Sequence, residues 1–181
     1  MRVEVDQSGK IGDTRVPTVL AFSDGEDYAI LFPAKVKREC VQRLREQGET
    51  GKTFYMRLFA VGLFFLLKDH ALTADQIAVD IEYPGRNAEV KLYLLNLLRQ
   101  ASIRIDGEVI HFEHIGKSSN AHKKALAVYT KEQMPDKVIK SDEILVLFQN
   151  KSDRDVSRGV TPSSATSGVL AGPWATRSLI L

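Results

Sequence analysis

The first third of the chain alternates short apolar runs with polar turns, at the spacing of β-strands. Residues 2–6 (RVEVD) alternate strictly between polar and apolar side chains, which is the period of a half-buried strand. Two further β-rich apolar runs, residues 16–22 and 28–32, flank Asp24 and Gly25, a dipeptide typical of tight hairpins. We therefore expect three antiparallel strands, the last two joined by a short turn.

Beyond Pro33 the pattern changes to helices that alternate with strands. Residues 35–47 carry apolar side chains every three or four positions, and residues 53–69 are almost continuously apolar. Asn87 can cap a helix that runs to about Gln100. This alternation predicts an α/β fold, a mixed sheet with helices packed on it. The remaining expected elements are strands over 76–83, 102–105 and 109–115, a helix over 119–132 and an apolar element of open type at 142–148.

The composition changes after Phe148, where Ser, Thr, Gly and Pro become frequent and apolar residues sparse. We expect residues 1–148 to form one folded domain and residues 149–181 a disordered tail. The 181 residues are 44% hydrophobic and 27% charged, a globular composition that excludes wholesale disorder and fibrous repeats. Cys40 is the only cysteine, which excludes a disulfide framework and predicts a cytoplasmic protein.

Two further patterns bear on the partners of the chain. The longest apolar run, residues 59–67, is much shorter than the roughly 18 residues that span a bilayer, so we expect a buried core helix and no membrane partner. The net charge of +2 demands no polyanion. However, residues 1–34 carry three basic and six acidic side chains, and residues 35–71 carry eight basic and four acidic. An acidic sheet beside a basic helical region suits a metal site next to a phosphate-binding surface, although solvated helix faces are the commoner cause of such charge.

Four short segments carry a resemblance to a known superfamily. They are VDQSG at residues 5–9, RE at 38–39, IAVD at 77–80 and SNAHKKALA at 119–127. Over residues 2–130 the chain resembles the ribonuclease H-like superfamily of nucleases, resolvases and integrases. The resemblance implies a ribonuclease H-like mixed sheet, three antiparallel strands and then parallel ones. It also implies an acidic residue on the first strand, the first helix and the fourth strand, and these are here Asp6, Glu39 and Asp80.

The resemblance further implies a metal site. The acidic position that the family has on its last helix falls on Lys124, and His122 just before it is the substitute ligand or product-release group. Carboxylates suit Mg²⁺ or Mn²⁺, and two such ions about 3.5–4 Å apart activate a water and stabilise the leaving oxygen in phosphodiester cleavage. Glu82 follows Asp80 by two residues and so shares its strand face. The implied catalytic residues are Asp6, Glu39, Asp80 and His122, and the implied metal ligands are Asp6, Asp80 and Glu82.

Basic side chains crowd two of the predicted helices. In the resembled fold both helices lie near the acidic site, where cations can hold a phosphate backbone. We therefore expect nucleic acid (RNA, DNA or a hybrid) as the partner. The expected contacts are Arg38, Arg43, Lys117, Lys123 and Lys124.

Three hypotheses for the function stay open. The first is a divalent-metal-dependent nuclease that uses a two-metal mechanism, which the pair Asp6 and Asp80 favours. The second is a non-catalytic ribonuclease H-like module that binds nucleic acid or a protein, which Lys124 at the acidic position favours. The third is a protein-interaction domain in which the apolar helix at 53–69 forms a homodimer interface. Whether the chain is an enzyme therefore stays open at this point.

Three other sites are weaker. Gly116, Lys117 and Ser118 follow a strand as a phosphate-binding loop does, but the leading glycine of such a loop falls on His111. Strand alternation puts His111 and His114 on opposite faces, which argues against a zinc site. Cys40 lies on the apolar stripe of its helix, so we expect it in the core and not as a nucleophile.

Overall fold

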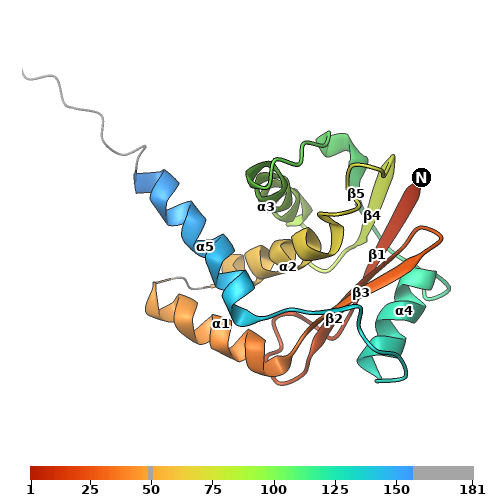
Figure 1. The fold of residues 1–181 in the computed structure, drawn as a ribbon, viewed down its shortest axis with the longest axis horizontal. Helices are drawn as coiled ribbons and strands as arrows, with labels where there is room; N and C mark the ends of the chain where they lie inside the picture. Colours follow the sequence, from red (N-terminus) through yellow and green to blue (C-terminus); the bar gives the residue numbers. More distant parts are fainter. Residues whose placement is uncertain (49–50, 157–181) are drawn as a thin grey trace, which may run out of the picture.

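The computed structural model describes residues 1–48 and 51–156 (Figure 1). For Lys52 and residues 150–156 it describes the backbone alone. Six strands form one sheet in the order β5-β4-β1-β2-β3-β6. The strands are β1 (Arg2–Ser8), β2 (Thr18–Ser23), β3 (Asp27–Phe32), β4 (Gln76–Asp80), β5 (Ile110–Glu113) and β6 (Lys137–Val138). The helices are α1 (Ala34–Glu46), α2 (Lys52–Leu67), α3 (Asn87–Gln100), α4 (Asn120–Tyr129) and α5 (Ser141–Val156), with a short 3₁₀ helix at Gly107–Val109.

Strand β1 lies near the middle of the sheet and joins its two halves. It pairs antiparallel with β2, which pairs antiparallel with β3. On its other side it runs parallel to β4, with Val5 opposite Val79, and β4 runs parallel to β5. The α/β fold class, with three antiparallel strands followed by parallel ones, is therefore confirmed.

The two faces of the sheet are covered unequally. Helix α4 covers one face, where Ala125 and Val128 pack on Val19, Ala21 and Ala29 of β2 and β3. Helices α1, α2, α3 and α5 contribute to the larger hydrophobic cluster on the opposite face, as their placement in Figure 1 shows. Because side chains alternate along a strand, neighbouring residues of β1 serve different layers, Val5 the large cluster and Asp6 the α4 side.

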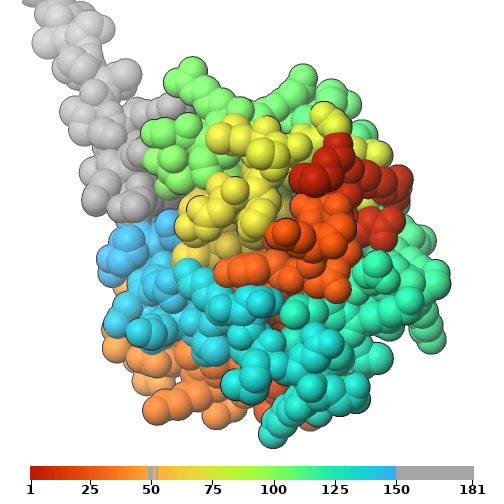
Figure 2. All heavy atoms as spheres, turned by 45° about the vertical axis from the view of Figure 1, so that its right-hand side comes forward, coloured from red at the N-terminus to blue at the C-terminus, as the bar shows by residue number. Residues whose placement is uncertain are grey.

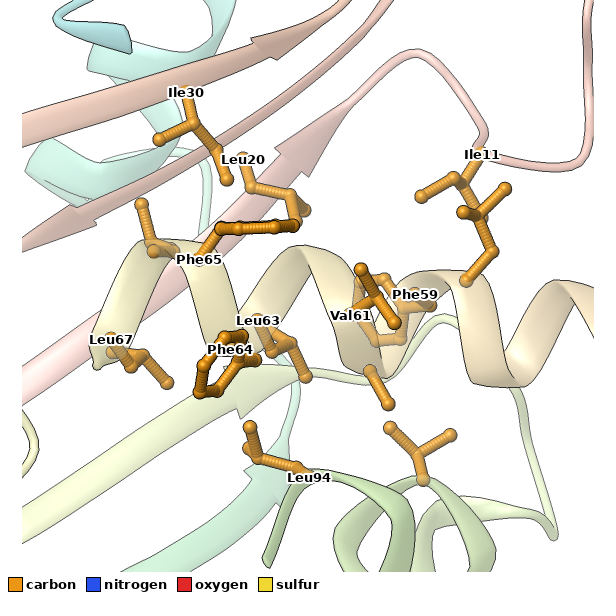
Figure 3. Packing of buried hydrophobic residues seen from close by; sticks show 14 of the residues in the cluster. Ile11, Leu20, Ile30, Phe59, Val61, Leu63, Phe64, Phe65, Leu67 and Leu94 are labelled. Carbon is orange, nitrogen blue, oxygen red and sulfur yellow. The ribbon is translucent and has the colours of Figure 1, made fainter. Parts of the chain in front are cut away.

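Helix α2 is the centre of the large cluster. Figure 3 shows its side chains reaching Leu20 and Ile30 of the sheet on one side and Leu94 of α3 on the other. Gly62 lets the helix approach the sheet, because a Cβ there would lie 2.5 Å from Leu20 Cδ1. Every residue from Met56 to Leu67 except Gly62 is among the buried side chains of the molecule. The helix buries these side chains inside its own chain, so the structure gives no support to the hypothesis that it forms a homodimer interface.

Helix α5 extends further than the sequence pattern suggested. The apolar element at 142–148 is the first part of this helix, and its Ile144, Leu145 and Phe148 join the core. Figure 2 shows the start of α5 (blue) beside α1 (orange), on the side of the molecule away from α4. The domain boundary expected after Phe148 thus falls within a helix, and the remainder of the expected tail, residues 157–181, lies outside the described residues.

The element boundaries differ from the expected ones in instructive ways. The strand expected over 76–83 ends at Asp80, and the one over 109–115 spans Ile110–Glu113. Residues 102–105 form no strand, and the two-residue strand β6 was not foreseen. The expected cap at Asn87 is wrong: Asn87 is the first residue of α3, and Arg86 precedes it without a side-chain cap hydrogen bond. Gly48 follows α1 with φ of +83°, and Ser119 accepts the amide of Ala121 at the start of α4. No helix in the described part of the chain is long and apolar enough to cross a membrane.

Candidate active site

Asp6 and Asp80 occupy equivalent places on neighbouring parallel strands. Since Val5 is paired with Val79, the next residue on each strand is an aspartate, and both project toward the α4 side. Asp80 Oδ1 accepts a hydrogen bond from the amide of Ile115 at 2.8 Å, in the segment that leads from β5 to α4. The sheet register therefore brings together the two carboxylates on which the nuclease hypothesis depends.

The first turn of α4 adds His122 to this pair. Its Nδ1 lies 2.8 Å from Oδ2 of Asp6, whose side chain is only 6% exposed. Ser119, the residue that caps α4, donates its hydroxyl to Glu4 Oε2 at 2.7 Å. These two contacts attach the start of α4 to β1. A carboxylate at Nδ1 favours the tautomer with the proton on that nitrogen, so Nε2 of the neutral ring keeps a lone pair.

The carboxyl groups act on one another electrostatically. Burial raises the pKa of Asp6, against the lowering effect of its hydrogen bond to His122, and the charge of Asp80 raises this pKa further. Burial also raises the pKa of Glu82 to about 7, with additional contributions from the charges of Asp80 and Asp6. We call Asp6, Asp80 and Glu82 the acidic cluster. The charge of Lys10 lowers the pKa of Glu82 and so opposes this shift.

The acidic cluster suits a divalent cation by the chemistry of its donors. Among the described residues, no three His, Cys, Asp or Glu side chains are grouped so that they alone could hold a metal ion. Magnesium, however, commonly binds through one or two carboxylates together with water and the phosphates of its substrate, not in an all-protein cage. Two neighbouring aspartates with unbalanced charge fit that mode of binding.

Glu39 lies elsewhere. Its helix α1 packs with the cluster on the face of the sheet opposite α4, and its carboxylate pairs with Arg43 at 3.3 Å, one helical turn along. The structure thus brings His122 to Asp6, with Asp80 on the neighbouring strand and Glu82 within electrostatic reach of both aspartates, and leaves Glu39 in a surface ion pair. The spacing of Glu39 and Arg43 suits such a pair equally well, which is why sequence alone could not separate the two roles.

The five basic residues expected to bind nucleic acid are in different situations. Arg38 donates to the carbonyl of Thr14 at 2.9 Å, and Arg43 pairs with Glu39. Lys124, 14% exposed, lies 3.4 Å from Asp136, a carboxylate that also accepts the amide of Ala29. Lys117 and Lys123 are exposed, before and within the first turns of α4. The cations that are both exposed and near His122 along the chain are therefore Lys117 and Lys123.

Cys40 lies in the core, as expected from its place on the apolar stripe of α1. It is fully buried, and burial raises the pKa of its thiol to about 12. A thiol with so high a pKa supplies almost no thiolate at neutral pH, so Cys40 acts as a small packing group.

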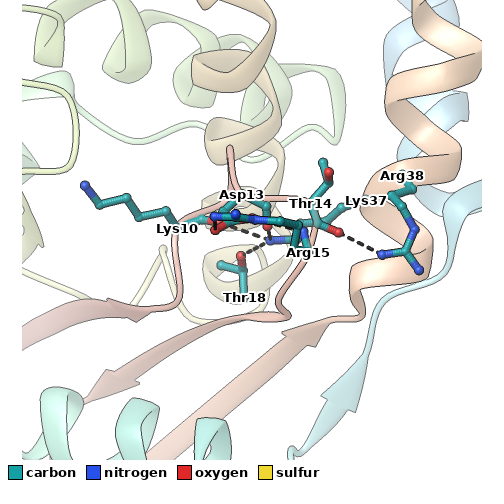
Figure 4. A network of polar contacts seen from close by, with 7 residues as sticks. All are labelled: Lys10, Asp13, Thr14, Arg15, Thr18, Lys37 and Arg38. Carbon is teal, nitrogen blue, oxygen red and sulfur yellow. Dashed lines mark hydrogen bonds and ion pairs between the residues drawn. The ribbon is translucent and has the colours of Figure 1, made fainter.

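Sequence reasoning missed a buried lysine that holds the loop after β1. Lys37 has no exposed surface, and its Nζ donates to the carbonyls of Lys10 (3.1 Å) and Asp13 (2.6 Å) and to Thr18 Oγ1 (2.7 Å) (Figure 4). Burial lowers the pKa of this amine to about 8, which leaves it mostly protonated at neutral pH. Three donors meet three acceptors, and the loop between β1 and β2 is held in one conformation.

A prediction on stability follows from Glu82. Because its folded-state pKa of about 7 is above the ordinary 4.5, the folded protein binds an extra proton between these values. This contribution to stability is fully present below about pH 4.5 and is lost as the pH rises through 7. We expect the free energy of unfolding of the metal-free wild type to fall by about 1–2 kcal/mol relative to Glu82→Gln over this window.

Chemical denaturation of both proteins in EDTA, at intervals from pH 4.5 to 8, checks this prediction. The exposed Glu26→Gln on the β2–β3 turn is the matched control and should keep the pH profile of the wild type. Parallel profiles for wild type and Glu82→Gln would show that the carboxyl titrates alike in the folded and unfolded chain.

Comparison with known proteins supplies no family for this arrangement. No protein-family model matches the chain, and neither the curated proteins nor the solved structures contain a match.

Proposed function

We propose that this chain is a divalent-metal-dependent nuclease of the ribonuclease H-like superfamily, which hydrolyses phosphodiester bonds in nucleic acid. The observation that carries the proposal is the placement of Asp6 and Asp80 at equivalent positions of adjacent parallel strands, with His122 bonded to one of them. Structural aspartates seldom lie so close in a half-buried place without a compensating cation.

The topology supports the superfamily part of the proposal. The chain begins with three antiparallel strands, and Asp6 lies on the first strand while Asp80 ends the fourth. Helix α4 brings His122 to Asp6. These are the places at which the resemblance predicts functional residues. Two positions do not fit: the Glu39 carboxylate is paired with Arg43, and Lys124 occupies the implied acidic position of the last helix.

Asp6 and Asp80 are the residues that would hold Mg²⁺ or Mn²⁺, with Glu82 beside them. When bound, such an ion supplies positive charge that stabilises the phosphate oxygens and lowers the pKa of an attacking water. The side chains otherwise available for proton transfer are then those of His122 and Glu82.

His122 has the arrangement of a general base. Asp6 holds Nδ1, so the ring is fixed in orientation and Nε2 can take a proton from water, with the carboxylate of Asp6 stabilising the imidazolium that forms. The 27% exposure of the side chain gives water access to the ring. The exposed Lys117 and Lys123 then face the phosphates of the substrate backbone.

A nuclease assay over labelled single-stranded, duplex, hybrid and branched RNA and DNA tests the proposal. We expect cleavage of at least one substrate with Mg²⁺ or Mn²⁺, none in EDTA, and none by Asp80→Asn under any condition. Cleavage that continues in EDTA, or that Asp80→Asn retains, would overturn the assignment.

Replacement of His122 tests its role separately from that of the carboxylates. His122→Gln keeps a hydrogen-bonding group near Asp6 but removes the titratable ring, and should lower kcat about 100-fold. We expect the acidic limb of the pH–rate profile to disappear in the variant. An unchanged profile measured by initial rates between pH 5 and 9 would assign His122 a structural role only.

The basic residues of α4 give a prediction on binding. Backbone contacts carry a salt slope of about −0.9 per phosphate neutralised on duplex DNA, and about −0.7 on single strands. The double variant Lys117→Ala/Lys123→Ala should make the slope of log affinity against log salt concentration less steep, by the contribution of one or two phosphates. Fluorescence anisotropy at several salt concentrations measures it, with the exposed Lys35→Ala on α1 as the control. Equal slopes would remove this surface from the binding site.

One observation favours a second function, a nucleic-acid-binding module without catalysis. Lys124 occupies the position at which the resemblance implies an acid. This lysine is paired with Asp136 and not with the acidic cluster. In that case binding would be retained without cleavage in every metal condition, and Asp80→Asn would bind as tightly as the wild type.

A further inference from the structure

Two surface pockets adjoin where β1 ends. The first, of about 470 Å³, is lined by the loop after β1 together with Glu82 and Tyr83, which follow β4. The second, of about 370 Å³, lies along α1. Tyr55 of α2 lines both pockets, so they meet at this side chain, and we call them together the Tyr55 groove. Each pocket has the volume of a small-molecule site, and Glu82 connects the first one to the acidic cluster.

The loop between β1 and β2 is a wall that the two pockets share. Its Asp13 and Arg15 line the first pocket, and Thr14 between them lines the second. Two side chains of α1 fix the loop backbone at this point (Figure 4). The buried Lys37 donates to the carbonyl of Asp13 at 2.6 Å. Arg38 donates to the carbonyl of Thr14 at 2.9 Å. The wall is therefore formed before a ligand arrives, which lowers the entropic cost of binding.

Cations are distributed along the groove. Lys10 lies in the first pocket, and Figure 4 shows its side chain extending away from the polar network of the loop. Arg38 and the exposed Arg45 lie in the second pocket. The bond to the Thr14 carbonyl uses one nitrogen of Arg38, and a guanidinium carries several further N–H donors for a ligand. Positive charges at intervals along a groove suit a backbone of successive phosphates.

The acidic side chains of the groove leave this positive charge largely in place. Asp13 is bound by Arg15 through two bonds of 2.9 and 2.8 Å, so its charge is neutralised within the loop. Glu82 belongs to the acidic cluster, where the proposed function places the metal ion. Among the described lining residues, Glu46 is then the carboxylate set against the three cations.

Two tyrosine rings provide apolar surface between these charges. Tyr55 and Tyr83 are both half-buried. Tyr55 packs edge-on against Phe54, with ring centres 5.0 Å apart, and Tyr83 packs against Phe59 at 5.7 Å. Gly12 leaves more of the Tyr55 ring accessible, because a Cβ there would lie 3.7 Å from it. Such rings stack on unpaired bases, whereas the bases of a duplex are covered by their neighbours.

We propose that the Tyr55 groove binds a single strand of nucleic acid without selecting its bases. Unpaired bases lie against the two tyrosine rings, and the backbone phosphates meet Lys10, Arg38 and Arg45. The role of the groove rests on the proposed function: the strand runs between the groove and the acidic cluster, so the substrate of the nuclease contains a single-stranded segment. Binding in the groove itself requires neither metal nor cleavage.

Fluorescence anisotropy in EDTA tests the groove. The probe is a labelled oligothymidine, alone and annealed to its complement. We expect the single strand to bind about tenfold more tightly than the duplex, or better, as stacking of one or two unpaired bases allows. Tyr55→Ala should bind the single strand about tenfold more weakly, and Tyr55→Phe, which keeps the ring, should match the wild type. Equal affinity for single strand and duplex, or equal losses in the two Tyr55 variants, would overturn the proposal.

Arg45→Ala keeps the test decisive if Tyr55→Ala does not fold, because Arg45 is exposed. A single strand contributes about 0.7 per phosphate to the slope of log affinity against log salt concentration, and this variant should lower the slope by about that amount. Arg99→Ala is the matched control, since Arg99 is exposed in the last turn of α3 as Arg45 is in that of α1, and it lines neither pocket. Identical slopes for the two variants would remove α1 from the binding path and overturn the proposal.

The nuclease assay separates this proposal from the proposed function. Single-strand binding that depends on Tyr55 and Arg45, without cleavage in any metal condition, would count against the nuclease function alone. Cleavage that Asp80→Asn abolishes, but that Tyr55→Ala and Arg45→Ala leave unchanged, would count against the groove alone.

Discussion

Asp6→Asn is expected to lower metal-dependent cleavage by about three to four orders of magnitude. The substitution acts on two groups at once. It removes one of the two charges expected to hold the cation, and it removes the acceptor that orients His122 through Nδ1. An asparagine amide presented to Nδ1 would favour the opposite tautomer, with the proton on Nε2.

Single-turnover cleavage of the best substrate, with enzyme in excess, measures this loss. Asp69→Asn is the matched control, because that aspartate is exposed and its ion pair among the described residues is with the neighbouring Lys68. Circular dichroism should report the same helix content for all three proteins. A loss of less than tenfold in Asp6→Asn would place the reaction elsewhere on the molecule.

Lys37→Met is expected to destabilise the fold by about 3 kcal/mol, the largest effect on stability outside the apolar core. Methionine fills a similar volume but leaves the carbonyls of Lys10 and Asp13 and the hydroxyl of Thr18 without their donor. For a domain of this size the melting temperature should fall by roughly 6–12 °C.

Differential scanning calorimetry of wild type and variant provides the measurement. Lys35→Met is the control, since the same change on the exposed side of the same helix should cost less than about 0.5 kcal/mol. If Lys37→Met melts with the wild type, the three acceptors must find other donors, and the loop is not held by this lysine.

Where the sequence pattern had a strong period, it predicted the fold well. The alternation over residues 2–6 and the Asp24 and Gly25 turn specify the antiparallel strands, because half-buried strands and tight hairpins each have a local chemical signature. Strand β6 has no such signature. It is two residues long and is stabilised by pairing with β3, a contact far away in the chain. The sequence pattern also did not predict the full length of α5, because the second half of this helix lacks a regular apolar stripe.

The same distinction applies to the candidate site. Aspartates near the ends of two predicted strands suggested the pairing of Asp6 with Asp80, and parallel strands do place them side by side. Lys37 was missed because its residue type indicated solvent exposure. Its position indicated the contrary: residues 37, 40, 41 and 44 have the spacing of one buried helix face, and all four are buried.

The position of β1 between β2 and β4 has a consequence for the order of folding. The β1–β2–β3 meander closes through short loops and is entropically inexpensive to form. Pairing of β1 with β4 must instead wait until two intervening helices have been brought into place, and such non-local contacts are the slow ones in small domains. Asp6 and Asp80 meet only in that step. After dilution from denaturant, the recovery of activity should therefore follow the slowest folding phase, even where the antiparallel half of the sheet is already formed.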